Sequence, residues 1–271
     1  MEYSVLMSVY YKEKPEYLKR SIDSMLNQTA KPSEIVIVKD GPLTDELDEL
    51  IAEYKKDNDE LFNIVVSECN LGLGKALNLG LKNCNNELVA RMDTDDISLT
   101  ERCEKQLSKF KSDNELVILG TAIDEFYSDE NKIISSRVVP TSNEEIYQFA
   151  KRRSPFNHPT VMYKKSKVLE LGGYSDLKRN QDVDLFGRMI FNGCKAANLE
   201  ESLLLFRSND DLSKRRKSWE NTKSYISVIK QFWKNGYSSL IDYLIVAFGQ
   251  TLMFICPLKF QNWIYKKFLR K

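Results

Sequence analysis

The sequence contains few of the residues that disulfide and soft-metal chemistry require. Its 271 residues include one histidine and five cysteines, and no two cysteines form a CxxC pair. An odd number of widely spaced cysteines indicates neither a disulfide framework nor a zinc site. This cysteine content fits a reducing, cytoplasmic compartment.

The sequence also has no strong excess of charge of one sign, no internal repeat and no sign of an export signal. Lys and Arg total 40 against 39 Asp and Glu, which gives a net charge of +1 and does not indicate a nucleic-acid partner. The first residues, MEYSVLMSVYY, lack the basic start and long apolar core of a signal peptide, so we expect no export. The length suits one large α/β domain with an appendage.

No apolar run is long enough for a typical membrane-spanning helix. Residues 243–258 pass without a charged side chain, but a spanning helix needs roughly 20 apolar residues, and this run includes Gly249 and Pro257. Trp263, Tyr265 and a cluster of basic residues follow. We predict a segment that lies on a membrane surface with its cations toward anionic headgroups. The alternative is a hydrophobic helix packed on the main domain.

Segments typical of strands and helices alternate through the first hundred residues. Valine- and isoleucine-rich runs predict strands, and apolar residues spaced three or four apart predict helices. The expected strands are 4–10, 34–41, 62–67 and 87–93, and the expected helices are 15–28, 45–56 and 72–84. This order is typical of a parallel sheet with helices on both faces. Further strands are expected at 115–127, 132–139 and 158–163, further helices at 143–152 and 181–193, and a helical tail from about residue 213.

Three aspartates, Asp93, Asp95 and Asp96, follow the fourth expected strand. Ligands of parallel α/β sheets bind beyond the carboxyl ends of the strands, which places this cluster and Asp40 on one rim. On an extended segment, Asp93 and Asp95 would project to the same side. Two converging carboxylates repel each other unless a cation neutralises them, and oxygen ligands favour Mg²⁺ or Mn²⁺ held together with substrate phosphates.

Part of the aspartate cluster, and a glycine-rich segment before it, also have simpler interpretations. Asp96 or Ser98 alone could cap a helix expected to begin near Thr100. The glycines of Asn70–Gly80, with Lys75 among them, could form a phosphate-facing turn at a helix start. Their spacing matches neither GxxxxGKS/T nor GxGxxG, so they fit ordinary turns and caps as well.

Six motifs follow one another along the chain: SVLMSVYYKEKPEYLKRSIDSMLNQTAKPSEIVIVKDGP, NLGLGKALNLGL, ARMDTDDISLTERCEKQ, RSPFNHPTVMYKKS, LGGYSD and QDVDLFGRM. In this order and spacing they resemble the family 2 glycosyltransferases of bacterial surface polysaccharides, above all O-antigen, capsule and amylovoran-type enzymes, over residues 4 to about 216. The resemblance implies a GT-A fold, a nucleotide-sugar donor with UDP-glucose or UDP-galactose first, a divalent metal and inverting chemistry. The apolar, basic tail favours a lipid-diphosphate-linked acceptor at the cytoplasmic face of the membrane.

The resemblance also implies roles for individual residues. The donor-binding candidates are Ser8, Val9, Tyr10, Asp40, Asn70, Lys75, Arg91, Asp93, Thr94 and Asp95. Asp93 and Asp95 match the family's DxD, whose carboxylates face the metal–diphosphate and the donor sugar, and Asp40 matches the aspartate that contacts the uracil or ribose. Asp182 matches the catalytic base. The sequence departs from the family pattern at Gln181, where the family has glutamate.

The chemistry that such a transfer requires can be stated without the family. One carboxylate must take the acceptor's proton, and positive charge must face the departing phosphates. Asp182 can do the first and a metal on Asp95 and Asp93 the second. Asp184, two residues further along a helix, would point elsewhere and is expected to cap or pair locally.

Several basic residues are open to more than one interpretation. Arg207, Arg215 and Arg216 could fold over the diphosphate as a cationic flap or face lipid phosphates, or they could form a solvated charge run. His158 could be a structural hydrogen-bonding residue, or it could line the acceptor or donor-sugar pocket or bind the metal. We expect Phe149, Phe156, Phe186 and Met189 to be core residues.

The predicted organisation is a glycosyltransferase domain over residues 1–212 and a helical tail over 213–271. Within the domain, 1–97 would bind the nucleotide and 98–212 would face the acceptor. Two rival functions remain at this point: an aspartyl phosphotransferase, since DxD at a strand end also serves phosphoryl-aspartate chemistry, and a non-catalytic nucleotide-binding component of a membrane assembly. The first is disfavoured because the DxD follows the fourth strand rather than the first.

Overall fold

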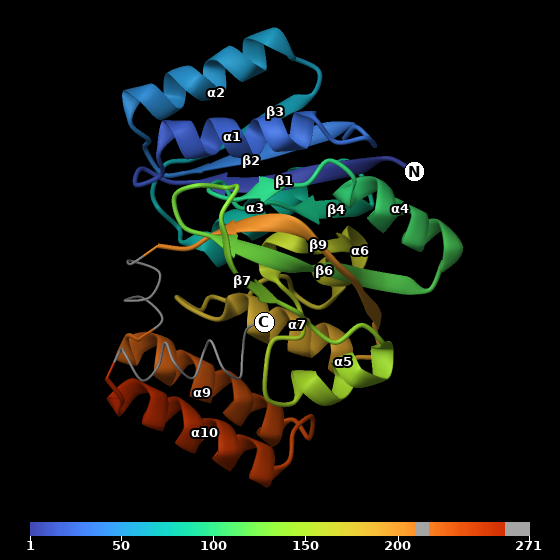
Figure 1. Ribbon diagram of the computed structural model, residues 1–271, viewed down its shortest axis with the longest axis vertical. Coiled ribbons are helices and arrows are strands. Elements are labelled where there is room, and N and C mark those ends of the chain that lie inside the picture. The colour runs from blue at the N-terminus through green and yellow to red at the C-terminus, as the bar shows by residue number, and fades with distance from the viewer. Residues whose placement is uncertain (210–216, 258–271) are drawn as a thin grey trace.

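The computed structural model describes residues 1–209 and 217–257, and a mixed sheet runs through its centre (Figure 1). The strands lie in the order β3-β2-β1-β4-β8-β6-β9-β5, with β7 paired to β6 beside this path. Their bounds are β1 Tyr3–Val9, β2 Glu34–Asp40, β3 Phe62–Ser67, β4 Leu88–Arg91, β5 Ile97–Ser98, β6 Leu116–Phe126, β7 Ile133–Arg137, β8 Met162–Lys164 and β9 Lys195–Arg207. The prediction of an α/β architecture, with a mixed, mostly parallel sheet and flanking helices, is confirmed in that the sheet is mixed and helices flank it.

The first half of the sheet follows the predicted alternation. Strands β1 to β4 are parallel to their neighbours, with Val5 beside Ile35 and Ala90 and with Val36 beside Asn63. Helices α1 (Pro15–Leu26), α2 (Asp45–Asp57) and α3 (Leu73–Asn83) connect these strands. All four carboxyl ends therefore meet at one edge.

The second half of the sheet departs from the parallel pattern. β8 is inserted antiparallel between β4 and β6, β6 and β9 are parallel, and β5 is antiparallel to β9. The expected strand 158–163 is instead a 3₁₀ turn, η1 (His158–Thr160), followed by β8. The sequence did not indicate β9, because its register shifts against β6 break the apolar alternation that marks a strand.

Helices cover both faces of the sheet. One face packs against α1, α2 and α4 (Arg102–Ser112), and the other against α3, α5 (Asn143–Ala150), α6 (Lys165–Glu170) and α7 (Gln181–Phe191). Of the four predicted core residues, Phe156, Phe186 and Met189 are buried, whereas Phe149 is only half-buried and carries the guanidinium of Arg153 over its ring.

Two helices, α9 (Trp219–Lys234) and α10 (Leu240–Ile255), form a hairpin at the end of the molecule opposite α2 (Figure 1). A small cluster with Val183, Phe232 and Val246 packs the hairpin against α7. The outer side of α10 exposes apolar side chains, among them Ile241, Leu244, Phe248, Leu252 and Ile255. The predicted apolar run is thus a helix packed on the main domain that also has an uncovered apolar side. No helix in the described part of the chain has the length and apolarity needed to cross a bilayer.

Candidate active site at the carboxyl ends of the strands

Asp40 organises the loop that leads into α3. Its carboxylate accepts hydrogen bonds from the amides of Leu71 (2.6 Å) and Gly72 (3.1 Å), and its carbonyl accepts one from Asn70 Nδ2 (3.1 Å). Gly41 follows with φ +88°, and a Cβ there would lie 2.7 Å from the Asn70 nitrogen, so glycine is required at this close approach. In the described structure, Asp40 and Asn70 therefore hold this loop in place on the predicted rim.

The aspartate-rich segment after β4 is a turn rather than an extended strand. Residues 94 and 95 form the turn, which overturns the premise that Asp93 and Asp95 project to one side. Arg91 Nη2 donates to Asp93 Oδ1, and Ser21 Oγ donates to the Asp93 carbonyl (2.8 Å). Thr94 Oγ1 donates to Glu13 Oε2 (2.5 Å), so the loop after β1 also supports the turn.

Asp95 lies close to other carboxylates, and the positive charge of Arg207 offsets their repulsion only in part. Burial first, and then repulsion from Asp93 and Glu13, raise the pKa of Asp95 to about 7. Asp93, in contrast, has a positively charged partner, because Arg91 forms an ion pair with it. A divalent cation at Asp95 would remove this repulsion.

Asp96 and Arg207 are structural partners of the turn. Asp96 is fully buried and accepts a hydrogen bond from the Arg207 amide (2.8 Å), while Arg207 Nε donates to the Asp95 carbonyl (2.9 Å). The Arg207 guanidinium lies 3.9 Å and 4.5 Å from the ring centroids of Tyr17 and Phe126. Arg207 is therefore a buried clamp, and the expectation that it belongs to a cationic flap is wrong. Arg215 and Arg216 lie outside the described residues.

The proposed capping roles of Asp96 and Ser98 are also wrong. The helix α4 begins at Arg102, and its N-cap position is Glu101. Asp96 belongs instead to the contact with Arg207, which explains its burial.

Two buried arginines, Arg91 and Arg102, contact the backbone next to the turn. Arg91 Nη1 donates to the carbonyls of Leu6 (2.9 Å) and Met92, and Arg102 donates to the carbonyls of Pro159 (2.8 Å) and Arg91 (3.3 Å). Both side chains are fully buried, and the Nε atom of each has no hydrogen-bond partner. These positive charges sit beneath a site rich in carboxylates, where they offset part of its negative charge.

The residues at the turn suit a hard divalent ion shared with a ligand. The described residues contain no group of three or more His, Cys, Asp or Glu side chains arranged to hold a metal by themselves. Mg²⁺ is typically held by one or two carboxylates together with substrate phosphates, and Mn²⁺ accepts the same oxygen ligands. The electrostatics favour Asp95 as the main ligand, with Asp93 Oδ2 as a second one because Oδ1 is taken by Arg91.

A cleft of about 650 Å³ joins residues that are far apart in the sequence. Asp93, His158 and Asp182 line it together with residues of α9 and α10. Asp182 lies in the first turn of α7 and is half-buried. The cleft thus brings the predicted base to the same cavity as the first aspartate of the DxD.

His158 has a structural contact and also lines the cleft. Its Nε2 lies 3.0 Å from the Tyr174 hydroxyl, and its ring packs against Tyr174 and Phe186. Burial, and then the nearby positive charge of Arg91, lower the pKa of His158. A neutral imidazole can orient a substrate hydroxyl but supplies no positive charge to a phosphate.

Two neighbours of Asp182 at the start of α7, Asp184 and Gln181, have different surroundings. Asp184 forms an ion pair with Arg188 (2.8 Å), so the expectation that it pairs locally is confirmed. Gln181 is buried, and its side chain packs beside Gly74 of α3. A Cβ built on Gly74 would lie 3.5 Å from Gln181 Cγ, which is an ordinary van der Waals contact. Its Oε1 has no hydrogen-bond partner. The side chain that departs from the family pattern therefore faces the start of α3.

The remaining predicted donor residues lie along the same rim with different exposures. Lys75, in the first turn of α3, forms an ion pair with Asp176 (2.8 Å), which ties this helix to the loop before α7. Ser8 is half-buried and Tyr10 is exposed, whereas the Val9 side chain is fully buried in the core. Val9 can therefore face a ligand only through its backbone.

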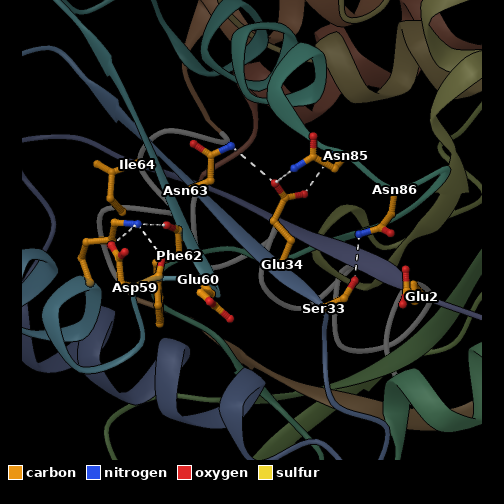
Figure 2. Close-up of a pocket in the computed structure, with 11 residues that line it drawn as sticks. Glu2, Ser33, Glu34, Asp59, Glu60, Phe62, Asn63, Ile64, Asn85 and Asn86 are labelled. Carbon is orange, nitrogen blue, oxygen red and sulfur yellow. Dashed lines mark hydrogen bonds and ion pairs between the residues drawn. The ribbon is translucent and has the colours of Figure 1, made fainter.

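A second cavity lies at the opposite, amino-terminal edge of the parallel strands (Figure 2). Glu34 stands at its centre, where it accepts hydrogen bonds from Ser4 Oγ (2.6 Å), Asn63 Nδ2 (3.4 Å) and Asn85 Nδ2 (2.7 Å), and Asn86 Nδ2 donates to Ser33 Oγ (2.9 Å). These polar groups satisfy one another and tie the starts of β1 to β4 together. The cavity is remote from the aspartate turn and has a structural explanation.

Sequence reasoning missed three residues of the site. Glu13 contacts the turn, Tyr174 contacts His158, and Asn180, at φ +60° before α7, donates to the Asn221 carbonyl of α9 (3.2 Å). Glu13 and Tyr174 stand inside the quoted motifs but have no local signature. An asparagine directly before a helix is a recognisable start signal, although its bond to α9 is a tertiary feature.

The fold is similar to that of known glycosyltransferase structures. The fold resembles that of the mannosyltransferase PcManGT from Pyrobaculum calidifontis, solved with GDP-Man and Mn²⁺, with a TM-score of 0.67 and 14% identity over 94% of this chain and 70% of that one. The architecture is therefore that of GT-A glycosyltransferases.

Sequence similarity then shows the family. The model of glycosyl transferase family 2 matches residues 4–172. The amylovoran biosynthesis glycosyltransferase AmsE of Erwinia amylovora is 38% identical over 98% of both chains. A UDP-Gal:alpha-D-GlcNAc-diphosphoundecaprenol beta-1,3-galactosyltransferase of Escherichia coli is 33% identical over 100% of this chain and 97% of its own. The chain belongs to glycosyl transferase family 2.

Proposed function

We propose that the protein is an inverting, metal-dependent hexosyltransferase of bacterial surface polysaccharide synthesis. It would move glucose or galactose from a UDP-sugar to a lipid-diphosphate-linked acceptor. The observation that carries the proposal is the cleft lined by Asp182, His158 and Asp93, beside Asp95, whose pKa is raised by burial and by neighbouring carboxylates. An acid–base residue and an ion-binding turn at one cavity are what such a transfer requires.

Asp182 would act as the base. It takes the proton of the acceptor hydroxyl as the acceptor oxygen forms a bond to the anomeric carbon. The bond from that carbon to the diphosphate oxygen breaks, and its electron pair leaves with the nucleoside diphosphate. One displacement inverts the anomeric carbon, and no enzyme-bound sugar forms.

Other residues would orient the reactants. Asp95 and Asp93 would hold Mg²⁺ or Mn²⁺, which supplies positive charge to the departing diphosphate when bound. Neutral His158 is suited to hydrogen bonding with a sugar hydroxyl in the cleft. The loop held by Asp40 and the start of α3 with Lys75 would receive the nucleotide, as the family resemblance implies.

The choice of substrates rests on the relatives. The similar Escherichia coli protein is named for UDP-Gal and a GlcNAc-diphosphoundecaprenol acceptor, and AmsE is named for amylovoran biosynthesis. Both cover nearly the whole chain, which favours a related donor and a related acceptor. The nucleotide side would be residues 1–97 and the acceptor side 98–212.

The tail supports action at the cytoplasmic face of the membrane. The outer side of α10 leaves Ile241, Phe248 and Ile255 between 66% and 73% exposed. Exposed apolar side chains on one side of a helix are typical of a segment that lies in a membrane interface. Deletion of residues 240–271 is therefore expected to release the protein from membranes, and unchanged sedimentation would count against this attachment.

Nucleotide release from a panel of UDP-, GDP- and dTDP-sugars tests the function. The panel is run with Mn²⁺ or EDTA, with and without a lipid-diphosphate-linked sugar. We expect release that requires metal and acceptor and favours one donor. Asp182→Asn should lower it by about 10²–10⁴-fold, the range of general acid–base contributions, with nucleotide binding retained.

Asp184→Asn is the matched control, because it removes the same charge from the same helix turn but outside the proposed chemistry. Activity that survives in Asp182→Asn would mean that another group is the base. Metal-dependent nucleotide binding without turnover of any donor would favour the non-catalytic alternative, and a trapped phosphoenzyme would favour the phosphotransferase.

A further inference from the structure

Helix α10 forms a wall of the catalytic cleft as well as an outer surface of the molecule. Six of its residues line the cavity that holds Asp182: Ile245, Val246, Gly249, Gln250, Met253 and Phe254. Their positions repeat at i and i+4, so they form one continuous side of the helix. Five of the six are apolar or glycine, which makes this wall more apolar than the sheet side of the cleft, where Asp93 and Arg137 stand beside Ile123 and Phe206.

Gly249 forms a notch in the middle of this wall. It lies between Ile245 and Met253, one turn away on each side, and a Cβ built on it would have no neighbouring atom within 4 Å. Glycine in a helix interior is destabilising compared with alanine, and nothing in the described structure requires it for packing. The absence of a side chain widens the cleft at this point.

The notch joins the cleft to the outer apolar surface. Ile245 lines the cleft and is also 47% exposed, and Ile241, Leu244 and Phe248 are exposed near it on the same helix. An elongated apolar ligand could therefore pass from the outer side of α10 across Gly249 into the cavity. We call the line Ile245–Gly249–Met253 the apolar trough.

Positive charge lies beside the trough. Arg152, Arg153 and Lys217 line the same cleft. Arg152 forms an ion pair with Asp242 at the start of α10, which places it beside the helix that carries the trough, and Arg153 and Lys217 line the cleft as well. The complementary ligand is apolar at one end and anionic next to it, with the anionic group close to the reacting end.

We propose that the apolar trough binds the hydrocarbon chain of an amphiphilic diphosphate, with the diphosphate against Arg153 and Lys217. This proposal rests on the proposed function, because the occupant is the lipid-linked acceptor whose sugar faces Asp182. It adds a lipid subsite that belongs to the enzyme itself. The enzyme binds the first part of the acceptor's chain as well as its sugar.

Calorimetric binding of dodecyl diphosphate and of inorganic diphosphate to the full-length protein tests the trough without any turnover. Below the micelle concentration and in EDTA, dodecyl diphosphate should bind at least about tenfold more tightly than inorganic diphosphate, because burial of even a few methylenes gives that factor. Gly249→Phe should abolish most of this preference and leave inorganic diphosphate binding unchanged. Gly249→Ala, which barely fills the notch, is the matched control and should behave as the parent protein.

Arg153→Gln should weaken both ligands by a similar factor. Equal affinity of the parent protein for the two diphosphates would overturn the proposal, as would a Gly249→Phe variant that keeps the preference or loses both ligands equally. A preference that emerges only after deletion of residues 258–271 would also overturn it, since the trough would then be occupied by the chain's own end. The nucleotide-release assay measures turnover, whereas calorimetry measures binding of the two diphosphates. Failure of the proposed function would appear as absent turnover, and failure of the trough as equal binding of the two diphosphates.

Discussion

The two walls of the cleft are built in opposite ways. The sheet side of the cleft, here called the sheet wall, carries the charged residues Asp93 and Arg137 beside Ile123 and Phe206. Asp93 is held by the buried Arg91, whose carbonyl accepts a hydrogen bond from Arg102. The helix wall consists of apolar residues of α10, which rests on α9 and leaves much of its outer side exposed. A wall with charged residues suits chemistry on a nucleotide-sugar, whereas an apolar wall suits an amphiphilic acceptor. Substitutions in the first wall should affect every acceptor, and those in the second only lipid-linked ones.

Removal of the charge beneath the sheet wall should have the largest effect. Arg91→Met leaves Asp93 without its ion-pair partner and removes the arginine donor from the carbonyls of Leu6 and Met92, of which Leu6 keeps the Met92 amide. We expect a loss of about 3 kcal/mol in the free energy of unfolding, typical of breaking a buried charge pair. Transfer to all acceptors should fall with it.

Urea unfolding and nucleotide release measure the two effects of Arg91→Met. Arg188→Met is a useful control, because it breaks the Asp184 ion pair outside the site. A variant as stable and active as the parent would show that the sheet wall does not depend on this buried charge.

The packing of the α9–α10 hairpin against α7 can be weakened by one substitution at Gly187. A Cβ on Gly187 of α7 would lie 2.1 Å from the buried ring of Phe232 on α9. Gly187→Ala should destabilise the protein by about 1–3 kcal/mol through overpacking, partly offset by about 1 kcal/mol of better helix propensity. The hairpin should separate from α7 more readily.

Limited proteolysis at the connection before α9, together with urea unfolding, reports this separation. Gly249→Ala makes the same chemical change where a Cβ has open space, so it should be neutral or stabilising. If both variants behaved alike, the packing of α9 on α7 would not be what holds the helix wall.

The outer side of the helix wall can be changed without touching the core. Phe248 is 73% exposed, so Phe248→Glu should change the free energy of unfolding by no more than about 0.5 kcal/mol. Binding to anionic lipid vesicles should fall roughly tenfold, because the free energy of burying one aromatic side chain in the interface is lost. Vesicle flotation measures the bound fraction.

Val66→Glu provides the comparison for Phe248→Glu, since Val66 is 63% exposed on β3, in the half of the sheet away from the hairpin. Equal loss of vesicle binding in both variants would indicate a general charge effect rather than insertion of α10.

The smallest effect should come from the histidine of the sheet wall. Burial and Arg91 lower the pKa of His158, so below the ordinary histidine pKa the unfolded chain binds a proton that the folded chain does not. His158 therefore contributes a loss of stability as the pH falls below about 6.5 toward the depressed pKa. His158→Gln should show a shallower loss between pH 7.5 and 5 in urea unfolding, measured in EDTA. An identical pH slope in the two proteins would refute this origin.

The accuracy of the sequence predictions differs between the halves of the sheet. Strands β1 to β4 were predicted within a few residues, because their apolar runs are continuous and their turns carry glycine or asparagine. β9 was missed, since two glutamates and register shifts interrupt its pattern, and β8 was expected to begin at His158. The DxD and Asp182 were recognised from motifs, whereas Glu13 and Tyr174 carry no local signal.

The sequence by itself determined the α/β class, the acidic cluster at the carboxyl edge and the membership in glycosyl transferase family 2, because periodicity and motif order are properties of neighbouring residues. Only the tertiary structure decided that Asp182 shares a cleft with Asp93, that Arg207 is a buried clamp and that α10 closes the cleft with an apolar wall. These facts depend on how β8 and β9 are inserted into the sheet and on how the hairpin packs on α7. Such long-range packing has no local pattern in the sequence, because it arises from the summed burial of many distant side chains.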